Sequence, residues 1–133
     1  MKKPALDKGQ RFSIKEEIED VFPIDYPVFC FKHLQRDYHL NKCTADEKKC
    51  LIEQIVLLSQ KTWDEIQLSP RHGSGSEKID IKSIKAPLPM SFTEDVKHLL
   101  ALRFDGKKAF VGFRHKFIFH IFYIDRDFTL YNH

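Results

Sequence analysis

The feature that most restricts the fold is a succession of apolar runs over the last third of the chain. The runs HLLALRF, KKAFVGF and FIFHIFYID are rich in β-branched and aromatic residues, which favour strands. Asp105–Gly106 separates the first two runs and suits a type I′ hairpin, because both central residues of that turn have positive φ. We therefore predict a four-stranded antiparallel meander that ends in FTLYNH. Its third strand is apolar on both faces, which predicts a central position.

Two capping boxes predict a pair of helices before the meander. Thr44 and Glu47 have the spacing of the first box, and TADEKKCLIEQIVLLSQ continues with apolar residues at helical intervals. Thr62 and Glu65 repeat this spacing, so TWDEIQLS is expected to form a second, short helix at an angle to the first. The residues predicted to make the inward stripes are Leu51, Ile55 and Leu58, backed by Ile52 and Val56, and then Trp63 and Ile66.

The N-terminal third supplies a strand and a basic segment. Residues 1–12 have no periodicity and are predicted to be a flexible basic arm. SIKEEIEDVF has capping-box spacing and recurrent apolar residues, so a short helix is expected there. YPVFCFKHL is predicted to be a strand, and Pro27 restricts it to a strand start or a sheet edge. The predicted fold class is α+β, a strand and helix pair packed on the meander, with residues 13–133 as one domain.

Residues 69–91 form a long segment rich in Ser, Gly, Lys and Pro. KIDIKSI alternates well enough for a brief strand, whereas Pro87 and Pro89 oppose regular structure further on. Arg71, His72 and Lys78 make the segment cationic, which suits the phosphates of a polymer because binding them releases counterions. An ordinary connector is the alternative. The glycines do not follow a nucleotide-binding pattern, so no cofactor is expected. Residues 92–100 are compatible with a helix or a strand.

A two-residue turn at Asp105–Gly106 places Arg103 opposite Lys108. Like charges in this position are unfavourable unless an anion lies between them. A bound anion would satisfy them, and so would a nearby carboxylate or access to water at the hairpin end. The sequence therefore gives Lys108 as a candidate contact to an anionic ligand.

His120 lies within the most apolar predicted strand. A buried neutral imidazole needs a hydrogen-bond partner, so one interpretation is a core histidine with such a partner. The other is a group that titrates near neutral pH beside Arg103, Arg114 or Tyr131. The turn decides between them: a two-residue HK turn pairs His120 with Val111, and a three-residue RHK turn pairs it with Phe110.

Four cysteine and histidine residues raise the alternative of a zinc site. Cys30 and His33, then His39 and Cys43, provide the four ligands of a tetrahedral site. Residues three apart in a strand point to opposite faces, so the spacing favours no metal. Three cysteines without a secretory leader favour a reducing, cytoplasmic location. No run approaches the roughly 18 to 20 apolar residues that a membrane span needs.

The order of a strand, a helix pair and a four-stranded meander, together with chain size and basic surface, resembles the RelE/ParE-like superfamily of small bacterial toxins. The likeness covers residues 24–133, and the chain departs from it by an extra N-terminal segment and a longer loop. It implies a small RNA-directed protein that would cleave RNA without a metal, with RNA or the ribosome and an antitoxin as partners. The alternative is a non-catalytic module that binds nucleic acid or protein. The sequence leaves the oligomeric state open.

In the catalytic version, a ribose 2′-hydroxyl attacks the adjacent phosphate. The groups expected to move protons are His120, His72 and Tyr131, and those expected to stabilise charge are Arg103, Arg114 and Lys78. Arg71, Lys78 and Lys108 are the expected nucleic-acid contacts. These assignments require the side chains to converge beside the glycine-containing segment.

Overall fold

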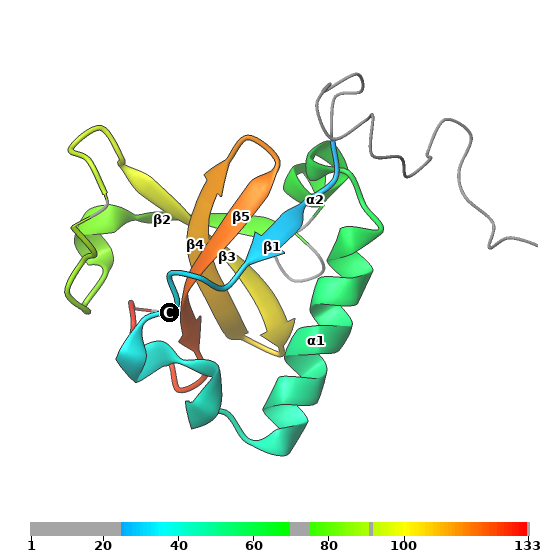
Figure 1. Ribbon diagram of the computed structural model, residues 1–133, viewed down its shortest axis with the longest axis horizontal. Helices are drawn as coiled ribbons and strands as arrows, with labels where there is room; N and C mark the ends of the chain where they lie inside the picture. Colours follow the sequence, from blue (N-terminus) through cyan, green and yellow to red (C-terminus); the bar gives the residue numbers. More distant parts are fainter. Residues whose placement is uncertain (1–24, 70–74, 91, 133) are drawn as a thin grey trace, which may run out of the picture.

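The computed structural model describes residues 25–69, 75–90 and 92–132. Its centre is a five-stranded mixed sheet with the strand order β1-β5-β4-β3-β2, and α1 lies against one face (Figure 1). The predicted α+β class and the antiparallel meander are confirmed. The strands are β1 Val28–Cys30, β2 Ser76–Asp80, β3 His98–Asp105, β4 Lys108–His115 and β5 Ile118–Asp125.

Both predicted helices form behind their capping boxes. The Thr44 side chain accepts the Glu47 N–H at 3.1 Å, and the Glu47 carboxylate accepts the Thr44 N–H at 2.8 Å. Thr62 and Glu65 exchange the same two bonds at 3.1 Å each. These bonds satisfy amide groups that have no partner within the helix. The helices are α1 Ala45–Ser59 and α2 Trp63–Leu68, accompanied by short 3-10 helices η2 Arg36–Tyr38, η3 Leu40–Lys42 and η4 Ile81–Ser83.

One core lies between the helices and the sheet. Leu51, Leu58, Trp63 and Ile66 are fully buried there, as predicted. The Trp63 indole also donates from Nε1 to the Phe117 carbonyl oxygen at 2.9 Å. The prediction that Ile52 and Val56 back this stripe is wrong, because both are about half exposed. A helical step of about 100° from Leu51 turns Ile52 away from the sheet.

A second core covers the opposite face of the sheet. It contains side chains of β2, β3, β4 and β5, which pack against loop residues and against the C-terminal segment, where Leu130 and Tyr131 are buried. The predicted fourth strand, FTLYNH, is wrong for the described residues 128–132. The Asp125 side chain accepts the N–H groups of Thr129 and Leu130 at 3.0 and 3.2 Å, which turns the chain back across the sheet. The fourth strand of the meander is β2, from the KIDIKSI segment.

Both hairpin turns differ from the predicted ones by a shift along the chain. The first loop is Gly106–Lys107, so Asp105 pairs with Lys108 and Arg103 pairs with Ala109. Gly106 has a φ of 59°, but Lys107 has no positive φ, so the turn is not type I′. An irregularity between Arg103 and Asp105 absorbs the difference. The predicted opposition of Arg103 and Lys108 is therefore wrong.

The second hairpin fixes the position of His120. Its loop is Lys116–Phe117, so His120 pairs with Phe113 and with neither of the two residues considered from the sequence. The strand of His120, β5, lies between β1 and β4, and the middle strand of the sheet is β4. β1 is an edge strand that begins directly after Pro27, as predicted, and it runs parallel to β5.

Residues 92–100, which the sequence left open between helix and strand, contain no helix, and β3 begins within them at His98. The predicted basic arm and the predicted helix of residues 13–22 lie outside the described residues. Within the described ranges, every helix is too short or too polar to cross a bilayer.

Candidate functional site

The sheet face opposite α1 carries a partly exposed group of residues at the β1 edge. Paired residues of neighbouring strands point to the same face, and so do alternate residues within a strand. The pairings of β1 with β5 and of β5 with β4 therefore build two rows. The first row is Val28, Ile118 and His115, and the second row is Cys30, His120 and Phe113. We call these six residues the histidine face.

The histidine face is open to solvent. Val28 and His115 are exposed, and the other four residues are partly exposed. Two rings border the second row: the Phe92 ring lies 6.1 Å from that of Phe113, and the His33 ring lies 5.6 Å from that of His120. Among the described residues these two rings cover the second row only in part, since Cys30, His120 and Phe113 all keep some exposed surface.

His120 is the most constrained polar group of this surface. Its Nδ1 atom is buried, and no hydrogen-bond partner from the described residues reaches it. Burial lowers the pKa of the imidazole, and the nearby His33 and His115 lower it further. His33 in turn stacks on the Phe122 ring, with centroids 5.4 Å apart and an interplanar angle of 10°. The surroundings of His120 therefore favour the neutral form of its imidazole.

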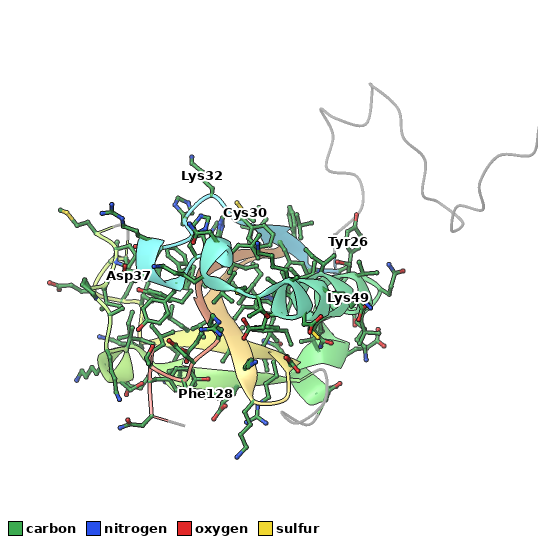
Figure 2. All side chains as sticks on the ribbon, turned by 90° about the horizontal axis from the view of Figure 1, so that it is seen from below. Tyr26, Cys30, Lys32, Asp37, Lys49 and Phe128 are labelled. Atoms are coloured by element: carbon green, nitrogen blue, oxygen red, sulfur yellow. The ribbon has the colours of Figure 1, made fainter. Side chains whose placement is uncertain are left out.

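Aromatic and cationic side chains adjoin the histidine face. Tyr26 and Phe31, just before and just after β1, are exposed by 42% and 38%. Lys32 follows Phe31, and Lys116 lies in the hairpin loop beside His115; both lysines are exposed. Tyr26, Cys30 and Lys32 lie along one side of the molecule (Figure 2). Exposed rings and positive charges thus flank the strands of the histidine face in the chain.

Arg103 and Tyr131 are brought together, away from His120. The pKa of Tyr131 is raised to about 12, mainly by burial and also by the charges of Glu77 and Asp125, which Arg103 opposes. Ala109 pairs with both Arg103 and Asp125. Arg103 therefore lies level with Asp125, the last residue of β5, whereas His120 is near the start of that strand. The five residues from His120 to Asp125 span about 16 Å.

Arg114 lies on the opposite face of the sheet from His120. It pairs with Phe119, and its guanidinium carbon is 4.4 Å from the centre of the Trp63 ring, a cation–π contact. Its Nε donates to the Lys116 carbonyl oxygen at 2.7 Å. The predicted convergence of Arg103, Arg114 and His120 is therefore wrong, because strand alternation and strand length separate them.

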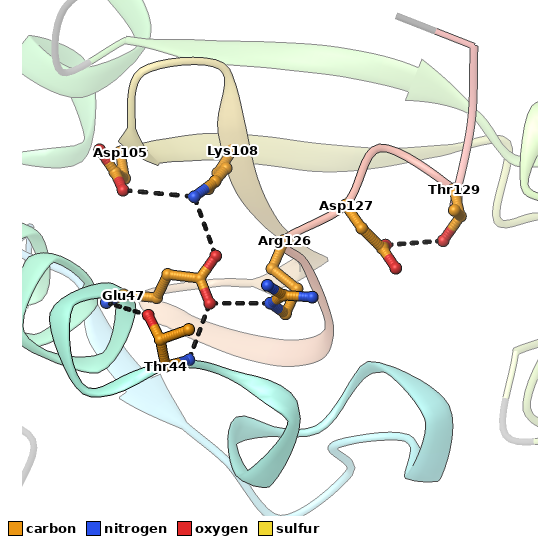
Figure 3. Close-up of polar contacts among 7 residues, drawn as sticks. All are labelled: Thr44, Glu47, Asp105, Lys108, Arg126, Asp127 and Thr129. Atoms are coloured by element: carbon orange, nitrogen blue, oxygen red, sulfur yellow. Dashed lines mark hydrogen bonds and ion pairs between the residues drawn. The ribbon is translucent and has the colours of Figure 1, made fainter.

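Lys108 belongs to an ion cluster around the buried Glu47 (Figure 3). Its Nζ lies 2.9 Å from Glu47 Oε2 and 3.6 Å from Asp105 Oδ2. Arg126 Nε donates to Glu47 Oε1 at 2.7 Å. Burial alone would raise the pKa of Glu47, but the Thr44 N–H, Arg126 and Lys108 lower it to about 2. The sequence left three ways to satisfy the charge of Lys108: a bound anion, a nearby carboxylate or water. The structure shows the carboxylate, that of Glu47.

The remaining predicted contacts are spread along the chain. Lys78 is exposed on the edge strand β2 and pairs with Leu100, which belongs to the core on the helix side. Arg71 and His72 lie outside the described residues.

A groove of about 520 Å³ lies between β2, η4 and residues 88–98. Its rim has Lys82 and Lys97, but also Asp80 and Glu94, so it has no strong preference for anions.

The four residues of the zinc alternative are not assembled. Cys43 is buried in the helix-side core, whereas Cys30 belongs to the histidine face. His39 accepts the Asn41 N–H at its Nδ1, at 3.3 Å. No group of three potential metal ligands occurs in the parts of the chain that the structure describes. All three cysteines are free thiols.

Sequence reasoning did not identify Glu47 as an ionic centre or His33 as a neighbour of His120. Glu47 was recognisable as a capping residue, but its charged partners come from β4 and from the end of β5. His33 was considered for a metal site, and no local pattern connects it to His120.

Comparisons with protein-family models, curated proteins and solved structures find no match to this chain.

Proposed function

We propose that this protein is a non-catalytic module that binds single-stranded RNA on the histidine face. The observation that carries the proposal is the partly exposed sheet surface of β1, β5 and β4, which carries the imidazoles of His115 and His120. Exposed aromatic residues and lysines flank these strands in the chain. Of the functions expected from the sequence, this one keeps the RNA partner and omits cleavage.

Stacking supports this choice of ligand. Unpaired bases stack on aromatic side chains, and each such contact contributes about 1–3 kcal/mol. Tyr26 and Phe31 offer exposed rings at the two ends of β1, and His115 offers an exposed imidazole on β4. Because every base has a flat π-face, we expect weak dependence on sequence.

Charge supports an anionic polymer on the same surface. Lys116 precedes β5 and Lys32 follows β1, so the two cations lie near opposite ends of the histidine face. Each phosphate that a lysine neutralises releases counterions, which makes binding fall as salt rises. We expect that salt dependence here.

The geometry favours binding over cleavage. Phosphate cleavage by the predicted groups needs a proton-transferring imidazole and an arginine at one phosphate. His120 has Arg114 on the other face and Arg103 at the far end of the sheet. A toxin of the RelE/ParE-like kind would need a different set of groups, and cleavage is therefore an outcome that the experiment must detect.

The test is fluorescence anisotropy of the full chain with a labelled single-stranded RNA of mixed sequence, at several salt concentrations. Phe31→Ala is expected to weaken binding about tenfold through lost stacking. Lys32→Ala and Lys116→Asn should each weaken it several-fold and reduce the slope of log K against log salt by about 0.7. Asn is chosen because Lys116 has a φ of 58°, which Asn tolerates.

Lys78→Ala is the matched control, since it removes an exposed lysine from the β2 edge. It should leave binding unchanged. Equal losses for Lys78→Ala and Lys32→Ala would move the contact away from the histidine face. Absence of RNA binding, or binding of a protein partner alone, would contradict the proposal, and shortened RNA on a gel would replace it with catalysis.

A further inference from the structure

Three histidines gather at the β1 edge of the sheet. His120 of β5 and His115 of β4 both belong to the histidine face, and they are diagonal neighbours because His115 pairs with Ile118. The His33 ring, from the segment that follows β1, lies 5.6 Å from the His120 ring at an angle of 58°. We call His33, His115 and His120 the imidazole cluster.

The imidazole cluster has no acidic partner among the described residues. The groups that the neighbouring segments place beside His120 are Cys30 from β1, Phe113 and His115 from β4, and His33. The charges that act on His120 are those of His33 and His115, and no described carboxylate contributes. A proton on one imidazole therefore opposes a proton on the next.

The neighbouring residues in the chain add positive charge. Lys32 precedes His33, Lys116 follows His115, and both lysines are exposed. The Nδ1 atom of His120 is buried and has no hydrogen-bond partner among the described residues. The charged form of His120 thus lacks compensation within the part of the chain that the structure describes. A bound anion would supply it, because a nearby opposite charge favours the charged form of a titratable group.

We propose that the imidazole cluster is a proton-dependent phosphate site, in which protonation charges the cluster and a phosphate group binds against it. The proposal rests on the proposed RNA binding for its ligand, a phosphodiester of the bound strand, and a free phosphate ion has the same chemistry. A phosphate presents several acceptor oxygens, so two neighbouring imidazoles can donate to it together. Protonation and binding favour each other, so RNA affinity rises as the pH falls.

The test measures this coupling from both sides. Fluorescence anisotropy of the full chain with a labelled single-stranded RNA should show about tenfold tighter binding at about pH 5.5 than at about pH 7.5, since one linked proton changes affinity by up to tenfold per pH unit. Ionic strength is held constant, and the phosphodiesters keep their charge over this range. In NMR titrations, saturating RNA should move the midpoint of the His120 ring to higher pH.

His120→Phe and, separately, His33→Gln should each remove most of the gain in affinity at low pH, because each removes one proton acceptor from the cluster. His98→Gln is the matched control, since His98 is exposed at the start of β3, and β4 lies between β3 and β5. It should keep the whole gain, and a loss equal to that of His33→Gln would overturn the assignment. Trp63 fluorescence reports whether each variant folds, and His33→Gln decides alone if His120→Phe does not.

Inorganic phosphate separates this proposal from RNA binding itself. If RNA fails to bind at either pH but phosphate raises the His120 midpoint, the phosphate site stands and the RNA proposal falls. Equal RNA binding at both pH values would overturn the phosphate site and leave RNA binding intact. Tighter binding at low pH with an unmoved midpoint would also overturn the site, because the proton would be taken up elsewhere. If neither ligand binds, both proposals are wrong.

Discussion

Glu47 of α1 and Lys108 of β4 lie 2.9 Å apart, and the glutamate is only 3% exposed. This pair joins the N-terminal turn of the helix to the first hairpin, and Arg126 joins the end of β5 to the same carboxylate. The capping bond to the Thr44 N–H completes the set. One side chain therefore ties a helix start to two strand ends.

Glu47→Gln should destabilise the fold by about 2 kcal/mol in urea unfolding. Removing one member of a fully buried ion pair costs about 3–5 kcal/mol. The cost is smaller here because Lys108 and Arg126 are 29% and 33% exposed and can turn towards water. Glu53→Gln is the control, because its pair with Lys49 is exposed and should contribute less than about 0.5 kcal/mol. Equal effects of the two substitutions would contradict the role of Glu47.

Stability should fall in acid as Glu47 takes up a proton. Its pKa is about 2 in the folded protein and 4.5 as the reference value for the unfolded chain. The folded state thus binds fewer protons between these values, so the contribution of Glu47 is complete above pH 4.5 and is lost as the pH falls towards 2. Urea midpoints measured across this range should decline less steeply for Glu47→Gln. Parallel curves for the two proteins would contradict the assignment.

His120 should make the fold less stable as the pH drops below the reference histidine pKa of 6.5. Its folded-state pKa is lowered by burial and by His33 and His115. The unfolded chain therefore takes up the proton first, and stability is lost from pH 6.5 down to the folded-state pKa. His120→Phe should flatten the curve in that window. Titration of the ring by NMR checks the cause directly, and a pKa at or above 6.5 would refute it.

Gly112→Ala should disrupt the pairing of β4 with β5. A methyl group at this position would lie 2.0 Å from the His120 carbonyl oxygen, so the backbone of one strand must move. We expect a loss of about 3 kcal/mol, the upper end of the usual cost of overpacking. Gly106→Ala is the matched control: a methyl group there meets nothing within 4 Å, but φ is 59°. It should cost about 1 kcal/mol, from backbone strain alone. Urea unfolding measures the loss of stability in both variants. A smaller loss for Gly112→Ala than for Gly106→Ala would contradict the close packing of β4 against β5 at Gly112.

Local patterns predicted the elements because their causes are local. The capping boxes at Thr44 and Thr62 start α1 and α2 where the spacing placed them, since each box involves residues three apart. The alternating run KIDIKSI contains most of β2, and Pro27 precedes an edge strand. FTLYNH failed because the Asp125 side chain captures two nearby N–H groups, which hydropathy does not reveal.

The candidate site depended on register, which the sequence left open. A change in the loop from His115–Lys116 to Lys116–Phe117 moved the partner of His120 from Val111 to Phe113. Irregularities between Arg103 and Asp105 and between Val111 and Gly112 changed the pairing again. The partner of His120 moved by two positions, so its face is the same as that of the two-residue turn, whereas the three-residue turn would have reversed it. The sequence left both turns open, so it could not settle on which face Arg114 lies relative to His120.

The sequence by itself determined the α+β class, the two capped helices and the apolar strands of the meander. Hydrogen bonds between residues three apart specify the helix starts, and the apolar, β-prone runs specify the strands. Only the tertiary structure decided which charged and titratable groups meet. Glu47 finds Lys108 and Arg126, and His120 finds His33, through packing between elements far apart in the sequence. Such contacts depend on strand register and loop paths, which are set by the free energy of the whole core.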